Sequence, residues 1–136
     1  MPSIKELRWI DLTSVHDERG ILTSIESSID IPFEVKRIFY MHHIVSDRGG
    51  HAHRDTDQII IAISGSFQIE LYDGTERLSY RLDNPIKGLF VPRMIFIQLF
   101  DFSKDAVCLV LASTHYDIKK SLRNIEDYNE AINIYE

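Results

Sequence analysis

Residues 47–58 read DRGGHAHRDTDQ, and Gly65 follows after six further residues. In a β-strand alternate side chains point to the same side, so His51 and His53 are expected to face one common space. Two adjacent imidazoles serve either to bind a metal ion or to take up and return protons near neutral pH. The preceding pair, Gly49 and Gly50, allows the backbone to approach a ligand closely, which favours a functional role over a purely structural one.

Around this stretch, short apolar segments alternate with turn signals. The segments are rich in Ile, Val, Phe and Tyr, as β-strands are. Ser64-Gly65-Ser66 and Tyr72-Asp73-Gly74-Thr75 are typical of tight hairpins. Many short strands at this spacing predict an all-β sandwich or barrel, and without any repeat or linker residues 1–136 are expected to form a single domain. The predicted strands are Ile21–Ile25, Val35–Ile44, His53–Ser64, Phe67–Leu71, Arg77–Arg81, Gly88–Val91, Ile95–Leu99 and Ala106–Ala112.

The C-terminal tail follows a different period. Its residues recur at spacings of three and four, which is the repeat of a helix; they are Leu122, Ile125, Tyr128, Asn129 and Ile132. We expect one short C-terminal helix, packed on the outside of the sheets and carrying no chemical motif.

Composition narrows the class of protein. The 136 residues are 44% hydrophobic and 26% charged, as in a soluble globular domain. The formal net charge of -6 argues against a nucleic-acid partner, whose phosphates require Lys and Arg, but a few convergent arginines can still bind an anionic small ligand. There is no run of about 18 apolar residues, no visible signal peptide and only one cysteine, Cys108. A cytoplasmic protein without membrane contact is therefore expected.

The stretch that contains His51 and His53 resembles the first cupin motif, in which a glycine region precedes His-x-His, a Glu and a further glycine. Gln58 stands where metal-binding cupins have the Glu. In the segment Pro92–Ile97, which matches the second motif, Met94 replaces the usual glycine and Ile97 the usual histidine. Because protein metal sites mostly offer three or four ligands, we expect no bound metal and no other cofactor.

The whole chain also resembles a narrower family, the sugar 3,4-ketoisomerases that act on dTDP-4-keto-6-deoxyglucose. This resemblance implies a cupin-type double-stranded β-helix, or jelly roll, that forms homodimers, often with exchanged N-terminal strands. It also implies that His51 is the main base and that His53 assists it. The matching stretches are Pro32–Tyr40, Arg48–Arg54 with Gln58, Leu82–Leu89, Asp101–Ser103, Val110–Ser113, Tyr116–Asp117 and Arg123–Asn124.

The chemistry of this family suits the residues. A 4-keto sugar has an acidic proton on C3; its removal gives an enediol(ate), and a proton returned to C4 leaves the ketone at C3. The enediolate needs cationic or hydrogen-bonding partners, for which Arg48 and Tyr40 are candidates. A solvated loop charge and a core aromatic are the alternative interpretations of these two residues.

Further candidates for substrate binding come from the same resemblance. Arg19 lies in a segment that matches an Asp-x-Arg-Gly sequence of the family, where the arginine borders the sugar, although a surface turn is equally compatible with it. Arg37 suits a bidentate contact with phosphate, or a salt bridge at a strand edge. Gln58 and Lys87 stand at matching positions. Leu7, Trp9 and Ile10 are apolar and suited to pairing with a second subunit.

The predicted function is therefore an isomerase that moves the keto group of a dTDP-linked 4-keto-6-deoxyhexose from C4 to C3. Its product would supply an aminotransferase that makes a 3-amino-3,6-dideoxy sugar for a surface polysaccharide. One departure concerns Ile97, because the family commonly has a polar residue there, so the configuration at C4 stays open. A nucleotide-sugar epimerase with a cupin fold and an inactive nucleotide-sugar-binding cupin are the alternatives.

Overall fold

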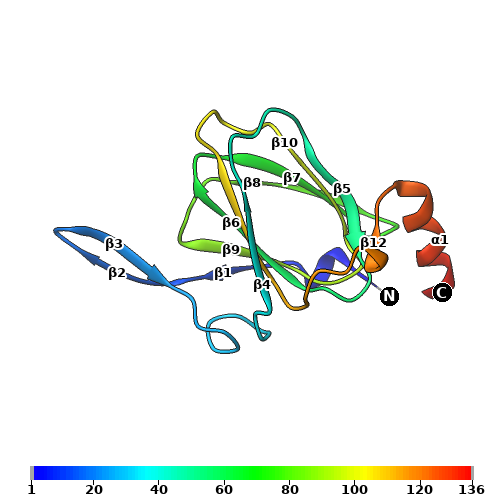
Figure 1. Ribbon diagram of the computed structural model, residues 1–136, viewed down its shortest axis with the longest axis horizontal. Coiled ribbons are helices and arrows are strands. Elements are labelled where there is room, and N and C mark those ends of the chain that lie inside the picture. Colours follow the sequence, from blue (N-terminus) through cyan, green and yellow to red (C-terminus); the bar gives the residue numbers. More distant parts are fainter. Residues whose placement is uncertain (1, 136) are drawn as a thin grey trace.

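The computed structural model describes residues 2–135, in which β-strands predominate (Figure 1). In chain order the elements are β1 (Arg8–Asp11), β2 (Thr13–Asp17), β3 (Gly20–Ser24), β4 (Arg37–Met41), β5 (Arg48–His53), β6 (Gln58–Ser64), β7 (Phe67–Tyr72), β8 (Arg77–Leu82), β9 (Lys87–Val91), β10 (Phe96–Phe100), β11 (Val107–Ala112), β12 (Ser121–Leu122) and α1 (Ile125–Tyr135), with single 3₁₀ turns at Ile4–Glu6 and Ile118–Lys120.

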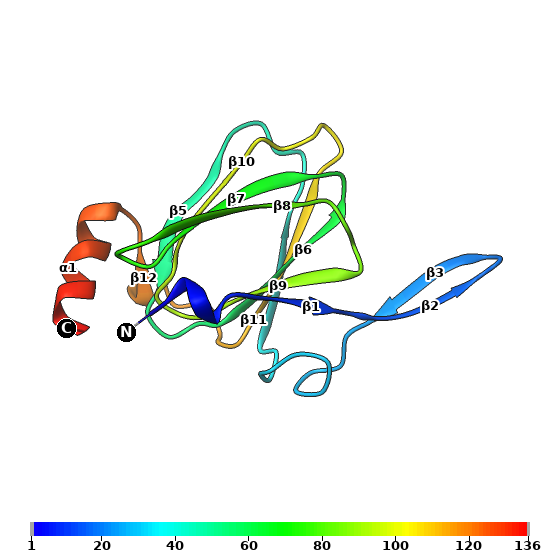
Figure 2. The same ribbon diagram turned by 180° about the vertical axis from the view of Figure 1, so that it is seen from behind.

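The strands form two five-stranded antiparallel sheets that face each other (Figure 2). One sheet has the order β1-β9-β6-β11-β4, and the other has the order β12-β5-β10-β7-β8. The expected cupin-type jelly roll with a short C-terminal helix is confirmed. No helix within residues 2–135 is long and apolar enough to cross a membrane.

The main core lies between the sheets and follows from the alternation of side chains along each strand. In β7, for example, Phe67, Ile69 and Leu71 are fully buried, while the residues between them are only partly buried. Each such side chain stabilises the fold by about 1.5–3 kcal/mol relative to an exposed position.

Strand β6 is buried on both faces, which explains its unbroken apolar run. Ile60 belongs to the core between the sheets, whereas Ile59 and Ile61 pack on the outer face against Leu12 and Ile31. The segments that flank the hairpin of β2 and β3 therefore cover part of this outer face.

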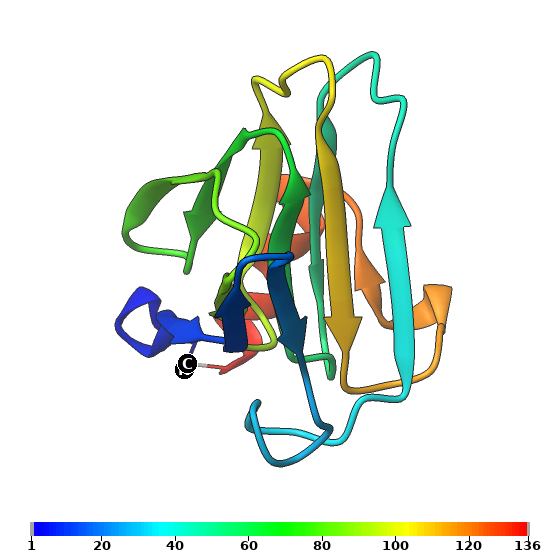
Figure 3. The ribbon, with the colours of Figure 1, turned by 90° about the vertical axis from the view of Figure 1, so that its left-hand side faces the viewer.

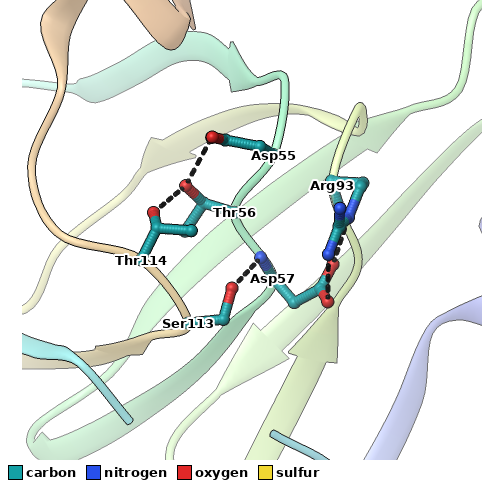
Figure 4. A network of polar contacts seen from close by, with 6 residues as sticks. All are labelled: Asp55, Thr56, Asp57, Arg93, Ser113 and Thr114. Carbon is teal, nitrogen blue, oxygen red and sulfur yellow. Dashed lines mark hydrogen bonds and ion pairs between the residues drawn. The ribbon is translucent and has the colours of Figure 1, made fainter. Parts of the chain in front are cut away.

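The predicted strand His53–Ser64 is in fact two strands from different sheets, because a polar turn separates His53 from Gln58. The side chains of this turn hold it to neighbouring segments (Figure 4). The hydroxyls of Thr56 and Thr114 lie 2.6 Å apart, and the backbone N–H of Asp57 donates to the hydroxyl of Ser113.

The Asp57 carboxylate also accepts hydrogen bonds from the guanidinium of Arg93, in an ion pair of 3.1 Å (Figure 4). Sequence periodicity does not detect this turn, because its four polar residues, 54–57, interrupt two segments that both alternate as strands do. The short strands β1, β2 and β12 are likewise absent from the predicted set.

The hairpin of β2 and β3 extends away from the body of the molecule and points toward the viewer in Figure 3. Its strands pair only with each other. Apolar side chains on it, Val15, Ile21 and Leu22, are each more than half exposed. An isolated two-stranded hairpin is at best marginally stable in water. Contact with another apolar surface would therefore stabilise this hairpin.

Candidate functional site

A cavity of about 200 Å³ lies between β4, β5 and the segment that connects β11 to α1. Its walls combine aromatic, cationic and imidazole side chains from three parts of the chain. The lining residues are Arg37, Phe39, His51, His53, Tyr116, Ser121 and Arg123. In Figure 1, β12 lies beside the end of β5, so the C-terminal segment closes one side of this space.

The glycines before the histidines create a β-bulge in β5. Both have left-handed backbone angles, with φ of +92° at Gly49 and +69° at Gly50. A Cβ atom on Gly49 would lie 2.8 Å from the carbonyl oxygen of Ile97 in β10. The glycine therefore permits the close approach of two strands, rather than the approach of the backbone to a ligand that the sequence suggests.

The bulge also sets which side chains face inward. His51 is directly opposite Ile97 and Arg48 is directly opposite Leu99, while Gly50 is the extra residue. Residues directly opposite each other share a face of the sheet. Because Ile97 and Leu99 belong to the main core, His51 and Arg48 both stand on the inner side of β5.

The two imidazoles are neighbours. Their ring centroids are 4.9 Å apart, and the rings are inclined by 79° in an edge-to-face arrangement. Burial lowers the pKa of His51; a hydrogen bond with the Gly49 backbone opposes this shift, and the charges of Arg123 and Arg48 add to it. Burial, together with the charges of His51 and Arg37, lowers the pKa of His53 to about 4. Both rings are therefore neutral near pH 7 and able to accept protons.

His53 is held from one side only. Its Nδ1 lies 3.3 Å from the hydroxyl oxygen of Ser121, which is directly opposite in β12. Its Nε2 is buried and has no hydrogen-bond partner among the described residues. Such an unsatisfied polar atom is uncommon in a folded protein.

Two guanidinium groups give the cavity a positive charge. Arg37 lies over the rings of Phe39 and Tyr116, at 4.8 Å and 5.1 Å from their centroids. Its Nε is buried and has no hydrogen-bond partner within the described part of the chain. Within residues 2–135, neither Arg37 nor Arg123 forms a salt bridge. An acidic protein thus presents a local site for an anion.

Of the residues predicted for the site, Arg37, His51 and His53 line the cavity. Arg48 is not part of its wall, but its charge acts on His51. Gln58 is buried near the start of β6, where alternation places it on the inner face with Ile60, and it does not line the cavity.

The structure does not bring the other three predicted residues to this cavity. Tyr40 is 62% exposed on the outer face of β4, because alternation along this strand turns Phe39 inward instead. Lys87 pairs with Asp11 at 3.4 Å in the other sheet. Arg19 lies at the tip of the hairpin and forms an ion pair of 2.7 Å with Asp17.

Four lining residues were not among the predicted ones: Phe39, Tyr116, Ser121 and Arg123. Three of them carry a usable signal in the sequence, since Phe39, Tyr116 and Arg123 belong to stretches that resemble the ketoisomerases. Ser121 and Arg123 are two residues apart, so an extended backbone turns both toward the cavity, but a strand of two residues leaves no recognisable pattern.

Helix α1 supports the histidine strand from behind. Ala52, which lies between the two histidines and is fully buried, packs in one cluster with Leu122 and Tyr128. The buried hydroxyl of Tyr128 donates to the carbonyl oxygens of Met94, at 2.8 Å, and Tyr72, at 3.1 Å. The expected helix without a chemical motif therefore has a positioning role for β5 and β12.

A metal centre has little support in the donor set. Within the described part of the chain, no group of three or more His, Cys, Asp or Glu side chains is placed to share an ion. Ile97 is a core residue and Gln58 lies outside the cavity wall, so the two imidazoles have no third ligand beside them.

Comparison with known proteins identifies close relatives. Residues 5–133 match the family model FdtA, described as WxcM-like, C-terminal. The chain is 34% identical over 129 residues to the TDP-4-oxo-6-deoxy-α-D-glucose-3,4-oxoisomerase of Aneurinibacillus thermoaerophilus, and the match covers 93% of each protein.

Solved structures agree with this assignment. QdtA, a sugar 3,4-ketoisomerase from Thermoanaerobacterium thermosaccharolyticum crystallised with TDP, is 32% identical, with a TM-score of 0.93 over 98% of both chains. A histidine-to-asparagine variant of QdtA was crystallised with TDP-4-keto-6-deoxyglucose; it is 33% identical over 95% of both chains, with a TM-score of 0.91. WlaRB, a TDP-quinovose 3,4-ketoisomerase from Campylobacter jejuni, is 34% identical, with a TM-score of 0.88 over 93% of this chain and 99% of its own. The chain therefore belongs to the FdtA family of WxcM-like domains, and over nearly its full length it is similar to TDP-sugar 3,4-ketoisomerases.

Proposed function

We propose that the protein is an isomerase that moves the keto group of dTDP-4-keto-6-deoxyglucose from C4 to C3. The observation that carries this proposal is the pair of neutral imidazoles, His51 and His53, in a cavity with two guanidinium groups that form no salt bridge. The relatives that act on TDP-linked keto sugars match nearly the full length of the chain, which supports the same substrate class here.

The proposed reaction moves two protons and no other atom. His51 removes the proton from C3; the C–H electron pair forms the C3–C4 double bond, and the carbonyl pair moves onto O4. The hydroxyl proton of O3 passes through His53 to O4. A lone pair of O3 then forms the new carbonyl while His51 returns its proton to C4, so the enzyme ends in its starting state.

The cationic side chains suit the nucleotide and the enediolate. Arg37 and Arg123 are available for the diphosphate, because guanidinium groups form bidentate, charge-assisted hydrogen bonds with phosphate oxygens. Tyr116 is 65% exposed beside Arg37 and offers a ring face to a base or sugar. Arg48, on the inner side of β5, is placed to lower the energy of a negative charge near His51.

A 3-keto sugar is a substrate for transamination, so we place the reaction before an aminotransferase that makes a 3-amino-3,6-dideoxy sugar for a surface polysaccharide. This placement rests on the chemistry of the product: a carbonyl at C3 is the group that an amine donor converts into a 3-amino group.

We also propose that two copies associate through the outer face of β6, β11 and β4. A second cavity of about 660 Å³ lies there, and its walls are almost wholly apolar. Ile38, Ile63 and Ile21 line it and are 60%, 44% and 59% exposed. A second copy would cover this face and the hairpin of β2 and β3. Covering them is favourable because apolar surface that is exposed to water costs free energy.

Of the N-terminal residues predicted to pair with a second subunit, Trp9 is 38% exposed. Leu7 is buried in the main core of its own chain, and Ile10 packs on the outer face of the same subunit. The hairpin is the segment left to reach a second copy. Since Arg19 stands at its tip and does not line the cavity of its own chain, we propose that this arginine contacts substrate in the partner's cavity.

Incubation with dTDP-4-keto-6-deoxyglucose in deuterium oxide, followed by NMR, tests the proposed reaction. We expect a 3-keto product with deuterium at C4, and deuterium at C3 in the remaining 4-keto substrate. Label at C5 would indicate an epimerase, and binding without exchange or product would indicate an inactive nucleotide-sugar-binding protein; either result would overturn the proposal.

A further inference from the structure

We propose that the hydroxyl groups of Thr56 and Thr114 position Tyr116 in the cavity wall for binding of the nucleotide. Tyr116 in turn orients the guanidinium group of Arg37. Neither threonine lines the cavity, so both are positioning residues that act through Tyr116. This inference rests on the proposed function, because it concerns how the same cavity binds a dTDP-linked sugar.

The hydroxyl pair joins the turn between β5 and β6 to the segment that follows β11 (Figure 4). The two Oγ1 atoms lie 2.6 Å apart, within the range of a strong O–H···O hydrogen bond. Thr56 also donates to the carboxylate of Asp55, at 3.3 Å. Thr114 is therefore the donor to Thr56, and the three groups form a short chain of hydrogen bonds. Because Thr56 is only 5% exposed, water does not readily replace this contact.

The same turn holds the segment at both of its ends. The N–H of Asp57 donates to the hydroxyl of Ser113 at 2.8 Å, and the N–H of Ser113 donates back to the carbonyl oxygen of Asp57 at 3.0 Å. Further along, the N–H of Arg54 donates to the carbonyl oxygen of Lys120 at 2.8 Å. Residues 115–119 therefore form a short loop whose two ends are attached to one turn.

Tyr116 is the residue through which this loop reaches the cavity. Its ring centroid lies 5.1 Å from Cζ of Arg37, and the ring centroid of Phe39, in β4, lies 4.8 Å from the same atom. Within residues 2–135 Arg37 forms no salt bridge and its Nε has no hydrogen-bond partner, so these two rings orient the guanidinium group. Since Tyr116 is 65% exposed and has little packing of its own, its place depends on the backbone that carries it.

A loop that is held before the ligand arrives lowers the entropy cost of binding. Without the hydroxyl pair, the loop would also populate arrangements in which Tyr116 leaves Arg37, and the nucleotide would select the ordered one. Affinity then falls by no more than the hydroxyl contact contributes to the ordered state, which for one hydrogen bond is at most about tenfold. His51 and His53 lie on β5 itself, so turnover of bound substrate should not change.

Calorimetry of dTDP binding tests the hydroxyl pair. Thr56→Val keeps the shape of the side chain but removes the hydroxyl, so the dissociation constant should rise by about threefold to tenfold, and Thr114→Val should give the same rise. Thr56→Ser keeps the hydroxyl and should stay within about twofold of the wild type. In the isomerase assay, Thr56→Val should raise KM by the same factor and leave kcat unchanged.

Ser103→Ala is the matched control. The Ser103 hydroxyl also joins two loops, because it accepts the N–H of Ser66, but it lies at the opposite end of the ladder that β6 and β11 form. Its loss should leave dTDP affinity unchanged. A second control uses Tyr116→Ala, in which the ring is absent. Thr56→Val should weaken binding no further in that background, because the residue on which it acts is gone.

Nuclear spin relaxation gives a reading that needs no ligand. The backbone order parameters of residues 115–119 should fall from about 0.85 toward 0.6 in Thr56→Val and stay high in Ser103→Ala. Unchanged order parameters or unchanged affinity in Thr56→Val, an equal loss of affinity in Ser103→Ala, or full additivity of Thr56→Val with Tyr116→Ala would overturn the inference. A wild type that binds no dTDP would overturn the proposed function, while the relaxation data would still decide whether the hydroxyl pair holds the loop.

Discussion

Ile97 lies directly opposite His51 across the ladder of β5 and β10, with its side chain only 4% exposed in the main core. The side chain that lies beside His51 on the inner face of the sheet is therefore the hydrocarbon of Ile97, which cannot donate a proton. This arrangement contributes to the burial that lowers the pKa of His51.

Replacement of the proposed base is the most direct test of this assignment. His51→Asn keeps a polar side chain of similar size but removes the base, so we expect a rate loss of about a hundredfold to ten-thousandfold. His53→Asn should cost less, because water can partly replace a relay. Both rates are measured by NMR with the keto sugar, and dTDP affinity should change little. Exchange of the C3 proton at nearly the wild-type rate in His51→Asn would show that the base is another group.

The acid side of the pH profile reports the state of His51. Its pKa lies below the ordinary 6.5, chiefly through burial, so the base stays neutral and active at pH 6.5. As the pH falls through the lowered value, protonation removes the base and kcat/KM declines. We expect the midpoint of that decline below 6.5 in a profile recorded with saturating and limiting substrate. A midpoint at or above 6.5 contradicts the buried, cation-flanked environment.

Nucleotide affinity distinguishes the cavity arginines from the lysine predicted at Lys87. Arg123→Gln should raise the dTDP dissociation constant by about tenfold to a hundredfold, since a hydrogen bond to a charged group contributes about 1.5–3 kcal/mol. Affinity should also weaken as salt rises. Lys87→Gln is the matched control, because Lys87 pairs with Asp11 away from the cavity. A larger effect of Lys87→Gln in calorimetry would show that the nucleotide binds at the other sheet and not in this cavity.

Removal of divalent ions should leave the activity unchanged. The two imidazoles lack a third ligand among the described residues, and proton transfer requires none. The assay compares enzyme before and after prolonged treatment with EDTA. Loss of activity that one specific divalent ion restores would contradict metal-independent catalysis.

Association of two copies depends on the apolar outer face. Ile38→Asp places a charge in the wall of the larger cavity, where burial against a second copy would desolvate it, so we expect a monomer at micromolar concentration. Val45→Asp is the control, since Val45 is 97% exposed and does not line that cavity. Sedimentation equilibrium measures both. A wild-type monomer, or equal dissociation of the two variants, would show that this face is not the interface.

Local periodicity was sufficient for the histidines but not for Tyr40. Alternation correctly placed His51 and His53 on one side, because their spacing lies within one strand. The sequence predicts the strand β4 but not which of its alternating side chains face inward. In the structure Phe39, rather than Tyr40, faces the cavity. Without knowledge of the partner strands, a sequence does not decide which of the two sets of alternate residues faces the core.

The remaining wall of the cavity depends on contacts that no local pattern reveals. Ser121 and Arg123 reach it through a strand of two residues, which is too short for a periodic signal. The bulge at Gly49 and Gly50 is visible in the sequence only as a pair of glycines. The close approach of the Ile97 carbonyl oxygen to Gly49 depends on a strand far along the chain, which no local pattern reveals.

The pairing of β5 with β12 has a consequence for the order of events during synthesis. Ser121 follows His53 by 68 residues, an interval of roughly 3 to 14 seconds on a ribosome that adds about 5–20 residues per second. Until β12 emerges, one edge of the histidine strand stays open to any other extended segment. A nascent chain halted in that interval would contain both imidazoles and yet have no working centre, and it would offer a chaperone the strand on which catalysis later depends.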